Sequence, residues 1–230
     1  MKTEIKTTND GSHTLFVPEL NEHYHSTHGA IQEAIHVYIN AGLHHCKKDE
    51  IHVLEIGFGT GLNAFLTLCE SIKNNKKIVY TSLELYPISV ADAQKLNYAS
   101  QICPENENLF LQLHEIEWEK KIDITPHFSL LKLNRNITDS TALAFSTKFD
   151  VIYFDAFAPD KQPEMWTHEI FKSILSICNS NAALTTYCAK GAVRRTMQKA
   201  GFMVERLTGP AGKREMLRAI SRFQISDSKI

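Results

Sequence analysis

An apolar run that ends in an acid and three closely spaced glycines constrains the fold of this chain more than any other feature. Residues 53–65 read VLEIGFGTGLNAF. Glycine lets the backbone turn tightly and approach a ligand that a Cβ atom would push away, and a helix start offers free N–H groups and a positive dipole end. The pattern predicts a strand, a turn at Gly57, Gly59 and Gly61, and a helix, which together form a nucleotide-type cofactor site.

The spacing of the glycines and the acid before them distinguish two classes of cofactor. Dinucleotide folds use G-x-G-x-x-G to seat a pyrophosphate, whereas this chain reads G-x-G-x-G with Glu55 two residues before the first glycine. A carboxylate there repels phosphate and suits a cation. S-adenosylmethionine carries a sulfonium, an ammonium and no phosphate, so we predict it as the cofactor, with Glu55 facing its ammonium directly or through water. Burying the Glu55 carboxylate without a partner would cost free energy, and this favours a contact with the ligand.

The order of strand and helix patterns predicts βαβ units and a parallel sheet. The expected helices cover residues 29–45, 62–72, 89–99, 164–178 and 191–200. The expected strands cover residues 51–56, 77–84, 149–155, 182–187, 202–207 and 215–221, with two or three short strands between 109 and 138. Because 208–214 is too short for a parallel crossover, the last two strands should form an antiparallel hairpin at the sheet edge.

This pattern predicts an α/β fold of the Rossmann-like class I S-adenosylmethionine-dependent methyltransferase type. Its sheet is mostly parallel and doubly wound with an antiparallel edge strand, whereas dinucleotide dehydrogenases keep every strand parallel. The 230 residues, 43% of them hydrophobic, suffice for one sizeable core. We expect residues 1–45 to form an N-terminal extension and leading helix packed on a methyltransferase domain over residues 46–225.

Composition excludes several other classes of protein. The chain has no apolar run long enough for a membrane span and no signal core, so we expect a cytoplasmic location and no membrane partner. Five scattered cysteines without a C-x-x-C pair favour neither a disulfide framework nor a zinc site. The eleven histidines have no H-E-x-x-H spacing, so no metal is predicted.

Charge is distributed unevenly along the chain. The net charge is −1, but residues 181–230 carry ten Lys or Arg against three acids. A basic region on an acidic body is a plausible footprint for a polyanion. An ordinary solvated helix face is an equally good interpretation on charge alone.

Two further acids are candidates for cofactor contacts. Glu84 ends the second strand, where Rossmann-type folds place a carboxylate on the ribose hydroxyls. Asp139 follows the third strand region, where such folds set an acid against the adenine amino group, although a turn-forming Asp is an equal alternative. The predicted cofactor-binding residues are Glu55, Gly57, Phe58, Gly59, Gly61, Asn63, Glu84 and Asp139.

The segment after the fourth strand carries the candidate catalytic residue. Residues 149–166 read FDVIYFDAFAPDKQPEMW, and the carboxyl ends of strands at the switch point bind ligands in open α/β sheets. Asp155 would sit beside the sulfonium methyl and hold the N–H of an amine that must be neutral and oriented. Phe157 and Trp166 could stack on a nucleobase, although aromatics after a strand are more often core.

The carboxy-terminal region supplies the remaining substrate candidates. Tyr187 could line the methyl site or simply pack at a strand end. Two cations on the predicted hairpin tip suit phosphate contacts, or mark an exposed turn. The predicted substrate-binding residues are Phe157, Pro159, Trp166, Tyr187, Lys190, Arg194, Arg195, Lys213 and Arg214.

Three blocks together resemble the MnmC/MnmD family: residues 54–63, residues 154–159 with 163–166, and residues 209–216. The resemblance implies methyl transfer from S-adenosylmethionine to the primary amine of 5-aminomethyl-2-thiouridine at the tRNA wobble position, giving 5-methylaminomethyl-2-thiouridine. It implies the tRNA anticodon region as partner and a functional link to other wobble-uridine modification enzymes. In two-domain relatives a flavin-dependent oxidase follows, so we expect the stand-alone methyltransferase form without FAD. Tyr24 and His28 are candidates for a lid.

Two other functions are compatible with the same residues. Polyamine synthases share the fold and acidic active sites, so a small-molecule amine methyltransferase or aminopropyltransferase is one alternative. The basic carboxy-terminal region argues against a cationic polyamine substrate. A non-catalytic RNA-binding module that retains the cofactor fold is the other alternative.

Overall fold

The computed structural model describes residues 2–222, which form two sheets and seven α-helices. The larger sheet contains β4 (Glu50–Ile56), β5 (Lys77–Leu83), β6 (Lys121–Thr125), β7 (Phe128–Leu133), β8 (Phe149–Phe154), β9 (Cys178–Thr186), β10 (Phe202–Thr208) and β11 (Glu215–Ser221). The smaller sheet contains β1 (Glu4–Thr7), β2 (His13–Val17) and β3 (Glu22–His23). The helices are α1 (Ala30–Ala34), α2 (Leu62–Asn74), α3 (Val90–Ala93), α4 (Tyr98–Ile102), α5 (Glu107–Glu115), α6 (His168–Ser176) and α7 (Gly191–Lys199). Short 3-10 turns cover Leu43–His45, Pro104–Asn106 and Pro163–Trp166, and a π-helical segment covers Ile35–Asn40.

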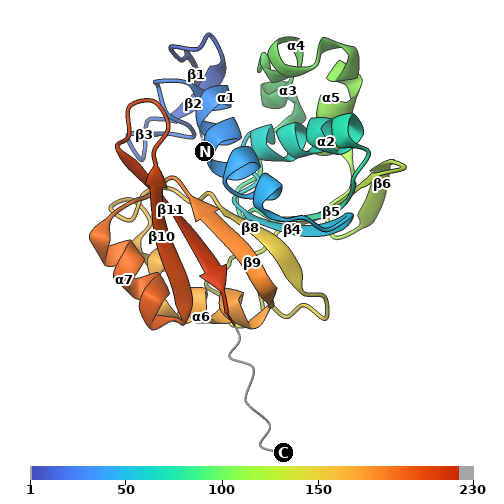
Figure 1. Cartoon of the computed structure of the whole chain (residues 1–230). Coiled ribbons are helices and arrows are strands. Elements are labelled where there is room, and N and C mark those ends of the chain that lie inside the picture. The colour runs from blue at the N-terminus through green and yellow to red at the C-terminus, as the bar shows by residue number, and fades with distance from the viewer. Residues whose placement is uncertain (1, 223–230) are drawn as a thin grey trace, which may run out of the picture.

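The larger sheet has the strand order β10-β11-β9-β8-β4-β5-β7-β6 (Figure 1). Strands β9, β8, β4, β5 and β7 are parallel, and β11 pairs antiparallel with both β9 and β10. The predicted Rossmann-like sheet with a reversed strand near its edge is therefore confirmed. A second reversed strand, β6, pairs with β7 at the opposite edge, and the sequence pattern does not predict it.

Helices cover both faces of this sheet. Figure 1 shows α1 and α2 on one side and α6 and α7 on the other. Alternate residues of a strand point to opposite faces, so Val53 and Tyr153 pack on the α2 side, whereas Leu54 and Phe154 pack on the α6 side. Because both faces are covered, the central strands read as continuous apolar runs.

Three parts of the chain differ from the sequence-based expectation. The helix expected over residues 89–99 is broken into α3 and α4, because the Asn97 side chain bonds the backbone of His13 and Gly11 in the N-terminal segment. Helix α5 lies where short strands are expected, and its Phe110 and Leu113, three residues apart, are both buried. Strands β1 to β3 occupy the extension, for which no strand is expected.

The N-terminal segment is held against the rest of the fold near the hairpin tip. The predicted β10–β11 hairpin is present, and its connection is closed by the Gly209 N–H to Arg214 O bond of 3.1 Å. Gly212 has a φ of +81°, and a Cβ atom there would lie 2.2 Å from the His28 ring. The tip and the end of the extension are thus in close contact.

Within residues 2–222, no helix is both long and apolar enough to cross a membrane. The predicted domain end at residue 225 lies outside the described residues.

We predict that Phe154→Ala lowers the free energy of unfolding by about 3–5 kcal/mol, because it opens a cavity in a packed layer. Phe154 is 0% exposed, and its ring centroid lies 4.9 Å from that of Trp166 and 5.1 Å from that of Phe171. Urea denaturation followed by circular dichroism measures the change. The control Ile72→Ala, at a side chain that is 42% exposed, should change it by less than about 0.5 kcal/mol. Equal effects of the two variants would contradict the packing described above.

Candidate active site

A cavity of about 550 Å³ opens where β4, β5 and β8 end. Ligands bind at the carboxyl ends of strands in open α/β sheets, and the volume is within the range of small-molecule sites. Six segments form the walls: the glycine turn after β4, the loops after β5, β7, β8 and β9, and residues 20–25 of the extension. Eight predicted site residues line it: Gly57, Phe58, Gly59, Asn63, Glu84, Asp155, Phe157 and Tyr187.

The glycine turn has the geometry that its sequence predicts. Gly57 has a φ of +94°, and a Cβ atom there would lie 2.6 Å from the backbone oxygen of Asp155. Gly61 has a φ of +74° and stands at the N-cap of α2. The turn thus brings bare backbone and a helix N-terminus to the cavity, which fits a ligand that approaches the chain closely.

Glu84 is fixed by the glycine turn itself. Its Oε2 accepts from the Gly59 N–H at 2.9 Å, and its Oε1 accepts from the Tyr86 N–H at 2.8 Å. A carboxylate has about four acceptor positions, so both oxygens retain capacity for ligand hydroxyls. The carboxylate lies on the cavity wall, as the ribose assignment requires.

Asp155 is held from both sides. The Tyr38 hydroxyl donates to its Oδ1 at 2.6 Å, and the Asn63 amide Nδ2 donates to its Oδ2 at 2.8 Å. Burial raises the pKa of Asp155 to about 6, although both hydrogen bonds act to lower it. The carboxyl group is therefore an oriented acceptor that is ionised at neutral pH and is more basic than an ordinary aspartate.

Tyr38 reaches Asp155 because of the local helix geometry. It lies in the π-helical segment, where Ala41 N–H bonds His36 O five residues back, and such widened turns are frequent at functional sites. Its ring packs against Tyr153 at a centroid distance of 5.2 Å. No local sequence signal separates Tyr38 from a core tyrosine, so only the fold identifies it.

Aromatic side chains form the wall next to Asp155. The Phe157 and Tyr24 rings meet edge to face at 5.3 Å. The Tyr187 hydroxyl donates to Ala156 O at 2.9 Å, which fixes that ring at the cavity. Of the two lid candidates, Tyr24 lines the cavity and His28 does not.

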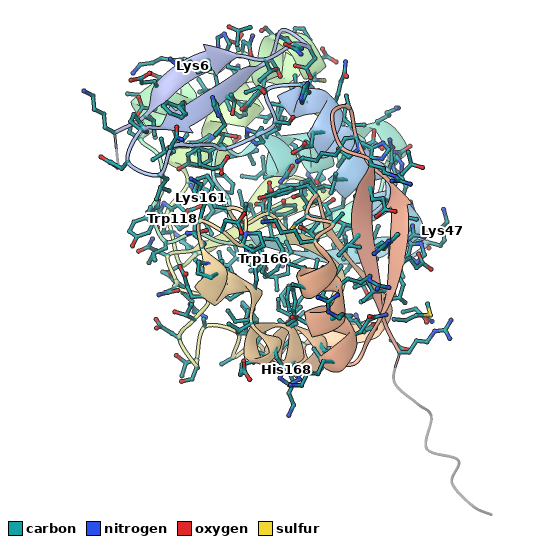
Figure 2. The ribbon with its side chains drawn as sticks, turned by 90° about the vertical axis from the view of Figure 1, so that its left-hand side faces the viewer. Lys6, Lys47, Trp118, Lys161, Trp166 and His168 are labelled. Atoms are coloured by element: carbon teal, nitrogen blue, oxygen red, sulfur yellow. The ribbon has the colours of Figure 1, made fainter. Side chains whose placement is uncertain are left out.

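Trp166 is a core residue, which corrects its prediction as a stacking platform. It is 6% exposed, its ring packs on Phe154 and Phe171, and its Nε1–H donates to Phe157 O at 2.9 Å. Figure 2 shows it in the interior of the ribbon, away from His168 at the start of α6. Its contribution to the site is to hold the loop that carries Phe157.

Four other predicted residues lie outside the cavity wall. Glu55 is 0% exposed and lies behind the wall, Gly61 shapes the turn, and Pro159 lies beyond the lining part of its loop. Asp139 is exposed in a turn closed by its N–H to Asn136 O at 3.0 Å. Asn136 and Ile137 line the cavity in its place.

The predicted phosphate-binding residues fall into two groups. Lys213 donates to Glu33 Oε2 at 2.8 Å and its ammonium lies 4.1 Å from the Tyr187 ring centroid, so this half-buried side chain supports the cavity wall. This corrects the prediction that Lys213 is an unpaired cation on the hairpin tip. Lys190 pairs with Asp160, and Arg194 is partly buried. Arg195 and Arg214 are exposed, and within residues 2–222 neither forms an ion pair.

Sequence reasoning misses several residues that line the cavity. His25 belongs to the extension, and burial lowers its pKa to about 4, so its ring is neutral. Lys161 donates to Leu20 O at 2.8 Å and so ties the loop after β8 to the extension. The further lining residues not predicted are Leu20, Ile56, Thr60, Leu62, Leu83, Leu85, Tyr86, Arg135, Ala156, Gln162, Glu164 and Met165. Within residues 2–222, no group of three or more potential metal-ligating side chains occurs.

Comparison with known proteins decides the family. The sequence model of a family described as S-adenosyl-L-methionine-dependent methyltransferase matches residues 99–222, more than half of the chain. The chain belongs to this family. The donor that the family uses is S-adenosylmethionine, in agreement with the prediction from the glycine turn.

Two similar sequences carry the same protein name. It is 29% identical over 227 residues to the tRNA 5-methylaminomethyl-2-thiouridine biosynthesis bifunctional protein MnmC of Paraburkholderia phymatum, a match that covers 91% of this chain and 33% of that protein. A protein of the same name from Ectopseudomonas mendocina is 30% identical over 213 residues, with 84% and 31% covered. The chain spans about a third of the length of these relatives.

Solved structures agree with these relatives. The crystal structure of MNMC2 from Aquifex aeolicus matches with a TM-score of 0.78 at 25% identity and covers 95% of this chain and 70% of that one. Spermidine synthase from Thermotoga maritima matches with a TM-score of 0.55 at 15% identity over 96% and 72% of the two chains, which shows a shared fold alone. The predicted MnmC/MnmD resemblance is confirmed.

We predict that Asp155 titrates with a midpoint near pH 6, where burial places its pKa. Its folded pKa lies above the usual aspartate value of about 3.9, so its contribution to the free energy of unfolding is full below about pH 4 and is lost as the pH rises through about 6. Carbon-13 NMR of labelled aspartate follows the titration. Tyr38→Phe should raise the midpoint because it removes a hydrogen bond to the carboxylate, whereas Tyr153→Phe, whose hydroxyl meets Thr67 instead, should leave it unchanged. An unchanged midpoint in Tyr38→Phe would refute the assignment.

We also predict that Lys213→Ala and Arg214→Ala differ in stability although the two residues are adjacent. Lys213→Ala strands the Glu33 carboxylate, whose side chain is 9% exposed, and should lower the free energy of unfolding by about 1–3 kcal/mol. Arg214→Ala should change it by less than about 0.5 kcal/mol. Urea denaturation compares them, and a larger loss in Arg214→Ala would contradict the pairing of Lys213 with the buried Glu33 carboxylate.

Proposed function

We propose that this chain methylates the primary amine of a 5-aminomethyl-2-thiouridine at the wobble position of tRNA, with S-adenosylmethionine as donor. The observation that carries the proposal is the Asp155 carboxylate, fixed by Tyr38 and Asn63 at the cavity beside the glycine turn. The names of the MnmC relatives support the choice of acceptor.

Amine methylation requires a neutral nitrogen whose lone pair faces the donor methyl carbon. When bound, the donor supplies a methyl group on a positively charged sulfur, which keeps the C–S electron pair as the new N–C bond forms. Asp155 accepts an N–H hydrogen bond from the amine and so directs the lone pair. Its raised pKa makes it a better acceptor for the proton that the product ammonium releases.

The other parts of the cavity wall suit the methyl donor on one side and the acceptor base on the other. Glu84 and the glycine turn would hold the ribose and amino-acid parts of the donor, since a carboxylate that can accept from hydroxyls and the N-terminus of α2 meet there. Phe157 and Tyr24 offer aromatic faces beside Asp155, and stacking of an extruded base contributes about 1–3 kcal/mol. Residues 20–25 would cover the base and exclude water.

The exposed cations suit the phosphates around the acceptor. Arg195 on α7 and Arg214 at the hairpin lack partners within residues 2–222 and lie in the basic carboxy-terminal region. Contacts to phosphates position a nucleic acid without reading its sequence. We assign these two residues, rather than Lys213, to the tRNA backbone.

The test is methyl transfer from labelled S-adenosylmethionine to tRNA that carries the free amine, followed by digestion to nucleosides. Label should appear in the methylaminomethyl nucleoside. Asp155→Asn should lower kcat by about 100-fold or more while cofactor affinity changes by less than about threefold, because the lost interaction serves the acceptor.

The control Asp123→Asn, an exposed acid on β6 at the far edge of the sheet, should retain full activity. Absence of label in tRNA carrying the free amine would refute the proposal. Label on a free diamine without RNA would favour the small-molecule transferase, and tRNA binding without measurable cofactor affinity would favour the RNA-binding module.

A further inference from the structure

A buried polar cluster lies behind the cavity wall, on the face of the sheet that α2 covers. At its centre is Glu55 on β4, which is 0% exposed. Ser82 on β5 and Tyr153 on β8 stand opposite it in register. The Ser82 Oγ–H donates to Glu55 Oε2 at 2.7 Å.

Three atoms of this cluster are unsatisfied. Among residues 2–222, neither Glu55 Oε1 nor Asn63 Oδ1 nor the Tyr80 hydroxyl has a hydrogen-bond partner. The Asn63 and Tyr80 side chains adjoin the Glu55 carboxyl group. Each buried group left unpaired costs about 1–3 kcal/mol, so three in one place call for a chemical explanation.

The protonation state of Glu55 explains two of the three atoms, the Glu55 and Asn63 oxygens. A carboxylate only accepts hydrogen bonds, and so does Asn63 Oδ1, so the two oxygens cannot satisfy each other. A carboxylic acid has one O–H, which can donate to Asn63 Oδ1 while the other oxygen still accepts from Ser82.

The orientation of the Asn63 amide follows from this arrangement. Its Nδ2 donates to Asp155 Oδ2 at 2.8 Å. An amide whose oxygen is held by a donor and whose nitrogen meets an acceptor cannot be exchanged end for end without losing both bonds. The proton on Glu55 therefore determines which end of Asn63 faces Asp155.

We propose that Glu55 is a positioning residue that works as a neutral carboxylic acid, donating its O–H to Asn63 Oδ1 and thereby directing the Asn63 amide N–H onto Asp155. The chain of contacts runs Glu55, Asn63, Asp155, and it ends at the carboxylate that faces the acceptor. The link to catalysis rests on the proposed function, whereas the protonation and the orientation of Asn63 do not.

The surroundings of Glu55 support the neutral form. The titratable groups that face it are Tyr80 from β5, Tyr153 from β8 and Asp155 after β8, and none of these is a cation. Asn63 from α2 adds an uncharged amide. Burial above all, together with the nearby Asp155 charge, raises the pKa of Glu55 well above its usual range, although its polar contacts with Ser82, Asn63 and Tyr80 act to lower it.

This inference replaces the prediction that Glu55 faces the ammonium of the donor. The side chain does not line the cavity and points into the α2 side of the sheet. The two roles differ in charge, and this makes them separable: an ammonium ligand must be a carboxylate, whereas the positioning role needs only a neutral donor.

The decisive variant is Glu55→Gln, which cannot ionise but can donate to Asn63 Oδ1 and accept from Ser82. Calorimetry with S-adenosylmethionine should give a Kd within about threefold of the wild type, and the Asp155 titration followed by carbon-13 NMR should keep its midpoint. Glu55→Leu, which lacks the donor, should shift that midpoint upward because Asn63 is no longer directed to Asp155. A Kd weakened about tenfold or more in a folded Glu55→Gln would overturn the proposal.

A direct measurement does not depend on whether Glu55→Leu folds. In protein labelled with carbon-13 at glutamate carboxyl groups, the resonance absent from Glu55→Gln should keep the shift of a protonated acid at neutral pH. A carboxylate shift for that resonance would overturn the proposal. None of these measurements uses RNA, so a failure of tRNA methylation with these results intact would refute the proposed function alone.

Discussion

The close approach of two backbone segments, at Gly57 after β4 and at Asp155 after β8, sets the geometry on which the site depends. A Cβ atom on Gly57 would lie 2.6 Å from Asp155 O, and the Asp155 N–H donates to Ile56 O at 3.0 Å. Only glycine allows both the positive φ and the contact. The glycine turn and the loop after β8 are therefore fixed to each other by backbone rather than by side chains.

A second constraint is the concentration of acids at this end of the sheet. Glu55, Glu84 and Asp155 all follow or end parallel strands, and their charges cannot all be buried without compensation. The structure resolves this in three ways. Glu84 accepts two backbone N–H bonds, Asp155 accepts two side-chain bonds at a raised pKa, and Glu55 is best accounted for as a neutral acid.

The extension and the hairpin tip complete the site from two ends of the chain. Lys161 bonds Leu20 O, and Lys213 pairs with Glu33 beneath Tyr187. These contacts join segments separated by 141 and 180 residues. Some cations of the basic carboxy-terminal region are thus paired with acids of the same chain. The total charge of this region therefore overstates the number of cations that can contact a polyanion.

The sequence by itself determined the sheet type, the glycine turn, the hairpin and the placement of Glu84, Asp155, Phe157 and Tyr187 at the cavity. These features depend on local patterns, such as strand alternation and glycine spacing, that act over a few residues. Tertiary structure alone decided that Tyr38 holds Asp155, that Trp166 is core, that Lys213 pairs with Glu33 and that Asp139 lies in an exposed turn. Which side chains share a buried space depends on contacts between segments distant in sequence, and no local pattern encodes those contacts.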